Sequence, residues 1–118
     1  MAKILIVDDD SDASESLVQF LGSGYEISCQ TSPDRAKKEI LTRGYDLVIC
    51  DTEFGRYPNL YLGFNLMKAV REEGVNVPFI GSSMNDDYRG EWESLGALFV
   101  HRVRGLSKYS AAVKQLIG

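Results

Sequence analysis

The sequence has few cysteines, a single histidine, no excess of positive charge and no long hydrophobic run. Two cysteines among 118 residues are too few for a disulfide framework. Both lie in apolar segments, so we expect Cys29 and Cys50 to be buried thiols in a reducing cytoplasm. The net charge of −4 argues against a nucleic-acid-binding surface, which needs basic residues to neutralise phosphates. No apolar run is long enough to cross a bilayer, and the start, MAKILIVDDD, lacks a signal peptide because acids follow a very short apolar run.

What is present is ordinary globular composition, with 44% hydrophobic and 25% charged residues. A chain of this length forms one domain and buries a core without disulfide or metal staples. We find no repeat, low-complexity segment or linker. We therefore expect residues 1–118 to form a single cytoplasmic domain that binds neither nucleic acid nor membrane.

Five short apolar runs alternate with amphipathic stretches along the chain. The runs predict strands over residues 3–7, 25–30, 46–50, 77–81 and 97–101. Helical spacing predicts helices over residues 10–21, 63–73, 85–95 and 107–117, and a further helix that begins at Pro33, after an N-cap at Ser32, and ends near Gly44. Strands that alternate with helices indicate parallel pairing, right-handed crossovers and helices on both faces of the sheet.

Acidic, hydroxyl or basic side chains at the ends of the first, third, fourth and fifth predicted strands are candidates for a binding site. In an open parallel sheet, ligands bind beyond the carboxyl ends of the strands. The residues at these ends are Asp8-Asp9-Asp10, Asp51, Ser82-Ser83 and His101-Arg102. We therefore expect several carboxylates, a hydroxyl and a cation to meet at one edge of the sheet.

Carboxylates that lie this close repel one another, and a divalent cation relieves the repulsion. Oxygen ligands favour Mg²⁺, and a carboxylate beside Mg²⁺ can attack a phosphorus centre. A hydroxyl and a cation at neighbouring strand ends can bind the other phosphoryl oxygens. Simpler interpretations remain open: Asp10 or Asp12 can serve only as a helix N-cap, and an Asp at a strand end is commonly a turn residue.

The residues at these positions resemble the receiver domain of two-component response regulators, and the similarity covers essentially the whole chain. The matching segments are residues 3–9 (KILIVDD), 45–51 (YDLVICD), 63–68 (GFNLMK) with Arg71, 77–83 (VPFIGSS) and 96–97 (GA), together with Ala36. The resemblance implies an α/β fold of the (βα)₅ flavodoxin-like, CheY-like type, a doubly wound five-stranded parallel sheet with strand order 2-1-3-4-5.

The resemblance also implies a role for each site residue. Asp51 would be the phosphoacceptor, and Mg²⁺ would be bound by Asp9, by Asp8 mostly through water, by Asp51 and by the backbone carbonyl of Glu53. Ser83 would be the switch residue and Phe99 the coupled aromatic residue. The implied partners are a sensor histidine kinase or phosphotransfer protein, a downstream protein or an output domain, and a second copy in a homodimer.

Three features depart from the family pattern. The family places a lysine followed by proline after the fifth strand, whereas this chain has Phe99-Val100-His101-Arg102-Val103. Counting from Phe99 puts Arg102 in the lysine's place, and counting from Gly96 puts Val103 there; we prefer Arg102 because it keeps the cation. The loop over residues 54–62 is longer and more aromatic than usual, and Met84 is bulkier than the small residue expected after Ser83.

Two other functional classes compete with a phosphoacceptor. One is a degenerate receiver that binds partners without phosphorylation, as the missing Lys-Pro pair, the altered loop and Met84 suggest. The other is an enzyme, because Asp51-Thr52-Glu53 resembles the acidic motif of metal-dependent exonucleases and haloacid-dehalogenase-type phosphatases. Those families place the motif early and have further catalytic residues far downstream, whereas here Asp51 lies near the middle of a short chain, which argues against an enzyme. A flavodoxin-like cofactor site would need glycines or hydroxyls after the first strand, where this chain has three acids. We therefore predict a signalling phosphoacceptor rather than an enzyme.

Overall fold

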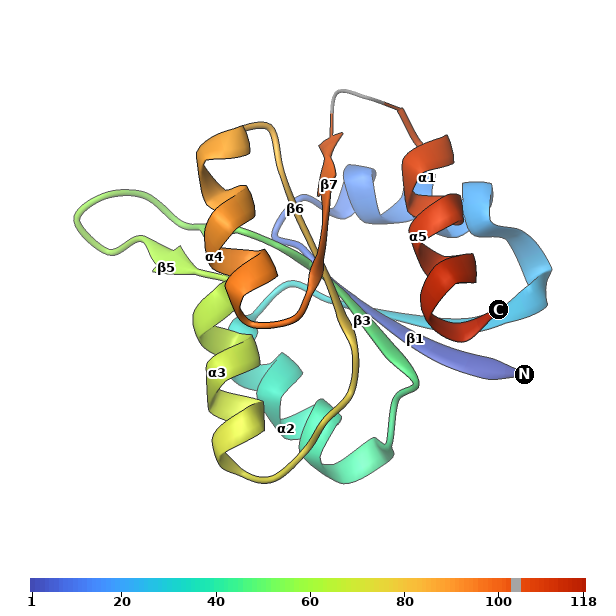
Figure 1. Ribbon diagram of the computed structural model, residues 1–118, viewed down its shortest axis with the longest axis horizontal. Helices are drawn as coiled ribbons and strands as arrows, with labels where there is room; N and C mark the ends of the chain where they lie inside the picture. The colour runs from blue at the N-terminus through green and yellow to red at the C-terminus, as the bar shows by residue number, and fades with distance from the viewer. Residues whose placement is uncertain (103–104) are drawn as a thin grey trace.

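A five-stranded parallel sheet forms the centre of the molecule (Figure 1). The computed structural model describes residues 1–102 and 105–118. The strands are β1 (Ala2–Val7), β2 (Tyr25–Gln30), β3 (Leu47–Asp51), β6 (Phe79–Ser83) and β7 (Leu98–His101), and they are arranged in the order β2-β1-β3-β6-β7. This is the predicted order, because β6 and β7 are the fourth and fifth strands of the main sheet. All four pairings are parallel, which confirms the predicted fold class.

Helices cover both faces of the sheet (Figure 1). They are α1 (Ser11–Leu21), α2 (Pro33–Arg43), α3 (Phe64–Glu72), α4 (Arg89–Ser94) and α5 (Ser107–Ile117). Successive strand residues point to opposite faces, so Ile4 and Ile6 of β1 join a core with α1 and α5, whereas Leu5 and Val7 join a core with α2, α3 and α4. Burial on both faces explains the continuous apolar runs of the central strands. No helix within the described ranges is long and apolar enough to span a membrane.

The first two helices begin at side-chain caps that the sequence indicates. Asp10 precedes α1, and its carboxylate accepts hydrogen bonds from the backbone N–H groups of Asp12 and Ala13. Ser32 precedes α2 and accepts from the N–H of Arg35, and Pro33 occupies the first helical position. These caps satisfy N–H groups that have no partner inside the helix. The N-cap interpretation therefore holds for Asp10 and not for Asp12.

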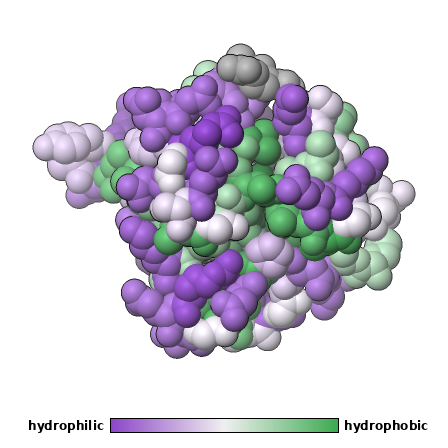
Figure 2. All heavy atoms as spheres, viewed as in Figure 1, coloured by the Kyte–Doolittle hydropathy of each residue, from purple (hydrophilic) through white to green (hydrophobic). Residues whose placement is uncertain are grey.

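The segment after Asp51, which we predicted to be a loop, is a β-hairpin. Strands β4 (Glu53–Phe54) and β5 (Tyr61–Leu62) form a separate antiparallel pair, and the connection between them projects from the body of the molecule (Figures 1 and 2). The rings of Phe54 and Tyr61 meet edge to face with centroids 6.4 Å apart, which stabilises so short a pairing. Tyr57, in the connection, is 90% exposed.

Two further predictions are wrong in detail. Residues 85–95 are not one helix: a 3₁₀ turn, η2 (Asp86–Tyr88), precedes α4, because the Asn85 side chain accepts from the N–H of Asp87 and holds a tight turn there. Cys29 is exposed rather than buried, because β2 is an edge strand with one neighbour. Cys50, on the central strand β3, is buried as expected.

Candidate functional site

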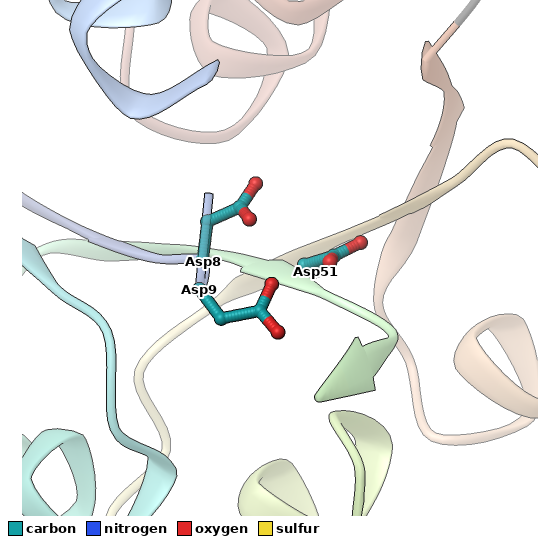
Figure 3. A group of neighbouring side chains, drawn as sticks. All are labelled: Asp8, Asp9 and Asp51. Carbon is teal, nitrogen blue, oxygen red and sulfur yellow. The ribbon is translucent and has the colours of Figure 1, made fainter. Parts of the chain in front are cut away.

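The carboxyl ends of β1 and β3 bring three aspartates together (Figure 3). Val7 of β1 pairs with Cys50 of β3, so the next residues, Asp8 and Asp51, lie at the same level of the sheet. One carboxylate oxygen each from Asp8, Asp9 and Asp51 lies within 4.8 Å of the other two. The convergence expected from the strand ends is therefore present.

Burial makes negative charge costly at this cluster. Asp8 and Asp51 are 7% and 8% exposed. Burial, and then the charge of Asp8, raise the pKa of Asp51 to about 6, although Arg102 and a hydrogen bond from the Thr52 N–H lower it. Burial likewise raises the pKa of Asp8, against the lowering effects of the Asp10 N–H and Arg102. A further cation at this site would stabilise both ionised carboxylates.

Arg102 supplies positive charge to two of the three aspartates. Its Nη1 lies 3.3 Å from Asp51 Oδ1, and its Nη2 lies 3.4 Å from Asp8 Oδ2. Arg102 directly follows β7, and its side chain is 24% exposed. The alternative position for the family's cation, Val103, lies outside the described residues. Arg102 thus places a positive charge beside Asp8 and Asp51.

The hairpin begins beside this cluster. Glu53 is the first residue of β4, two positions after Asp51, and it is exposed. The backbone N–H of Gly55 donates to the Asp9 carboxylate at 3.4 Å. This contact between the hairpin and Asp9 was not predicted from the sequence, because it depends on the fold of the loop.

The other two residues expected at the site lie on β6 and β7. Ser83 is the buried last residue of β6, and its Oγ accepts a hydrogen bond from the Asn85 N–H at 2.9 Å. Phe99, on β7, is 8% exposed, and the guanidinium of Arg89 lies 4.8 Å from its ring centroid. Ser83 therefore ends its strand at the same edge of the sheet as Asp51, whereas Phe99 lies further back, beside α4.

Sequence reasoning missed Thr52 and Trp92. The indole Nε1 of Trp92 donates to Thr52 Oγ1 at 2.8 Å, and both residues are fully buried. One signal was available: Gly81 interrupts an apolar strand, and a glycine inside a strand often marks the close approach of another group. Here that group is the indole of Trp92, because a Cβ on Gly81 would lie 2.1 Å from Trp92 Cδ2.

The donor set at the cluster fits a divalent cation that prefers oxygen. Its three carboxylates present no nitrogen or sulfur ligand, and Mg²⁺ is characteristically bound by one or two carboxylates together with waters and phosphate oxygens. The residues present thus fit the metal that the family resemblance implies.

Comparison with known proteins agrees with the fold. Residues 4–100 match the response regulator receiver domain family. The transcriptional regulatory protein DltR of Streptococcus agalactiae is 30% identical over 79 residues, which are 66% of this chain and 34% of that protein. The matched region thus spans about a third of the curated relative.

Solved structures with the same fold are also response regulators. The response regulator TrrA of Thermotoga maritima, determined in complex with Mg²⁺ and BeF, superposes with a TM-score of 0.86 and 28% identity over 99% of this chain and 100% of that one. The chemotaxis response regulator CheY4 of Vibrio cholerae has a TM-score of 0.80 and 20% identity over 99% of each chain. With the family match over most of its length, this chain belongs to the response regulator receiver domains of two-component signalling systems.

Proposed function

We propose that this receiver domain is a Mg²⁺-dependent phosphoacceptor that takes a phosphoryl group on Asp51. The observation that carries the proposal is the cluster of Asp8, Asp9 and Asp51, whose oxygens lie within 4.8 Å of one another at the carboxyl edge of the sheet. Asp8, Asp9, Asp51 and the backbone carbonyl of Glu53 would hold the metal. The Mg²⁺–BeF complex of TrrA supports this assignment, because that protein is 28% identical over nearly all of this chain.

Asp51 would act as the nucleophile. One of its carboxylate oxygens forms a bond to phosphorus, while the bond from phosphorus to the donor breaks and the donor leaves with the electron pair. With a pKa of about 6, Asp51 is mostly ionised at neutral pH, as the attack requires. Mg²⁺, when bound, supplies positive charge that offsets the negative charge on the phosphoryl oxygens.

Arg102 and Ser83 would bind the transferred group. Arg102 already contacts Asp51, so its guanidinium lies within reach of a phosphoryl group attached there. Ser83 has a hydroxyl hydrogen to donate, because its Oγ is the acceptor in its bond with Asn85. Movement of Ser83 toward the phosphoryl group would then start the conformational change.

The output would be a change in the surface formed by α4, β7 and α5. Apolar side chains gather between α4 and α5 in Figure 2, over a groove of about 380 Å³. Leu98, Phe99 and Ala112 line it, and Arg89, Glu93 and Lys108 add charges. The phosphodonor would be a histidine kinase or phosphotransfer protein in the cytoplasm, and the receiver of the signal a downstream protein, an output domain or a second copy of the chain. Catalysis would be limited to the domain's own phosphorylation and dephosphorylation.

Intact mass spectrometry after incubation with acetyl phosphate and Mg²⁺ tests the proposal. We expect the mass of one phosphoryl group on the parent protein and none on Asp51→Asn or without Mg²⁺. An adduct that persists in Asp51→Asn would move the acceptor to another residue. A parent protein that gains no mass from the small donor or from a phosphorylated histidine kinase would overturn the proposal in favour of a phosphorylation-independent interaction module.

A further inference from the structure

The indole of Trp92 is held in a fitted recess between α4 and the sheet. Its ring lies over Gly81 of β6, where the absence of a side chain makes room for it. Phe64 of α3 approaches it edge to face and Phe79 of β6 stacks on it, with centroid distances of 6.0 and 6.2 Å. Packing from α3 and β6 thus fixes the indole in one orientation.

The polar edge of this indole enters a short chain of hydrogen bonds. Trp92 Nε1 donates to Thr52 Oγ1 at 2.8 Å, and Thr52 Oγ1 donates to the backbone carbonyl of Ser82, also at 2.8 Å. Because a threonine hydroxyl carries one hydrogen, donation to Ser82 leaves its lone pairs to accept from the indole. All three residues are at most 3% exposed, so water cannot readily replace a lost partner.

Thr52 and Ser82, two members of this hydrogen-bond series, each adjoin a residue of the proposed mechanism. Thr52 follows Asp51, and its backbone N–H bonds to the Asp51 carboxylate. The Thr52 carbonyl accepts from the Gly63 N–H at 2.6 Å, which fixes the backbone of Thr52 on its other side. Ser82 precedes Ser83, and the Ser82 carbonyl belongs to the peptide group that joins the two residues.

We propose that Thr52 and Trp92 are positioning residues that report the state of the Asp51 site to α4. The inference rests on the proposed function, because it requires that the site be filled. When Ser83 moves toward a phosphoryl group, the peptide between Ser82 and Ser83 turns and displaces the carbonyl to which Thr52 donates. Thr52 then loses or redirects that bond, and the bond to Trp92 changes with it. The hydrogen-bond series through Thr52 thus has an intact and an altered arrangement, and these are the two states that coupling between the Asp51 site and α4 needs.

The chain contains one tryptophan, so its fluorescence reports on this position directly. The probe is beryllofluoride with Mg²⁺, added to the full chain as a stable phosphoryl analogue. Bound fluorine resonances in a ¹⁹F NMR spectrum measure occupancy independently of Trp92. Amide hydrogen exchange over Arg89–Ser94 measures the response of α4.

Two substitutions at Thr52 separate the hydroxyl from the packing. Thr52→Ser keeps the hydroxyl, whereas Thr52→Val keeps the shape and loses it. On saturation we expect the parent and Thr52→Ser to show a shift in Trp92 emission and a change of about fivefold or more in α4 exchange. We expect Thr52→Val to bind beryllofluoride with an affinity within about threefold of the parent, but to lose most of both responses.

The outcomes are distinguishable. A saturated Thr52→Val whose α4 exchange changes as in the parent would overturn the inference and leave the proposed function intact. Absence of bound fluorine signal in the parent would overturn the proposed function, and the inference with it. If Thr52→Val does not fold, Trp92→Phe removes the indole N–H while keeping an aromatic ring. An undiminished α4 response in that variant would equally overturn the inference.

Discussion

Arg102 reaches across a whole strand to pair with Asp51. Asp51 ends β3 and Arg102 follows β7, and β6 lies between those two strands. The 3.3 Å contact between Arg102 Nη1 and Asp51 Oδ1 therefore depends on a long side chain with a forked end. The same fork reaches Asp8 through Nη2, so one cation neutralises part of the charge on two buried carboxylates.

Arg102 should both compete with the metal and assist phosphorylation. We expect Arg102→Gln to bind Mg²⁺ several-fold more tightly, because the guanidinium no longer occupies Asp8 and Asp51, yet to accept phosphate from acetyl phosphate about tenfold or more slowly. Arg102→Lys should retain most of the rate. Calorimetric Mg²⁺ titration and phosphorylation kinetics measure the two effects. Arg43→Gln, on α2, is the control for net charge, and the interpretation fails if Arg102→Gln behaves as this control does.

The raised pKa of Asp51 predicts how folding stability depends on pH. An acid whose pKa rises from 3.8 to about 6 on folding binds its proton more tightly in the folded state, so the fold loses stability as pH rises from about 4 to about 6 and no more above that. We expect Asp51→Asn to be more stable than the parent at pH 7.5 without metal, by up to about 3 kcal/mol. The advantage should roughly halve by pH 5 and vanish below about pH 4. Urea unfolding across this range measures it, and an advantage that grows as pH falls would contradict the burial argument.

Substitutions at the neighbouring residues Asp9 and Asp10 should affect different properties: Mg²⁺ binding at Asp9 and folding stability at Asp10. Asp10 caps α1, so Asp10→Ala should lower the free energy of unfolding by about 1 kcal/mol and leave Mg²⁺ affinity nearly unchanged. Asp9 is exposed and belongs to the metal cluster, so Asp9→Asn should weaken Mg²⁺ binding by about tenfold or more without loss of stability. Denaturation in EDTA and Mg²⁺ titration provide the two readouts. Equal effects of both variants on both readouts would refute this division.

The recess over Gly81 predicts a large cost for one added methyl group. A Cβ at this position would lie 2.1 Å from the ring of Trp92, so Gly81→Ala must displace the indole or the strand. We expect a loss of about 1–3 kcal/mol in the free energy of unfolding and an altered near-ultraviolet circular dichroism spectrum of Trp92. Gly90→Ala is the matched control, because a Cβ there meets nothing within 4 Å and alanine favours the helix. Similar stability of the two variants would show that Trp92 does not fill this recess.

The parts of the structure that can be predicted are those that depend on short stretches of the sequence. Burial on both faces makes strands such as β3 continuous apolar runs, and side-chain caps such as Ser32 mark where helices begin. Because the carboxyl ends of parallel strands share an edge, the meeting of Asp8 and Asp51 also follows from the strand pattern.

The remaining features depend on contacts between distant segments. The hairpin rests on the pairing of Phe54 with Tyr61, and strands of two residues have no detectable periodicity. Trp92 and Thr52 are 40 positions apart, and nothing in either local sequence indicates that they share a hydrogen bond. The exposure of Cys29 follows from the place of β2 at the sheet edge, which the apolar run alone does not reveal.

The hairpin is closed at its base, and it contacts the body of the domain through buried Phe54 and through the Gly55 N–H. The Gly63 N–H bonds to the Thr52 carbonyl at 2.6 Å, so residues 53–62 form an excursion that is closed at its base. Doubling such a loop costs only about 0.6 kcal/mol in closure entropy. Insertions at the hairpin tip, beyond Gly55, should therefore leave the strand register of the main sheet unchanged. Related chains are free to vary in length here, and a reporter peptide could be grafted at Tyr57 without redesigning the domain.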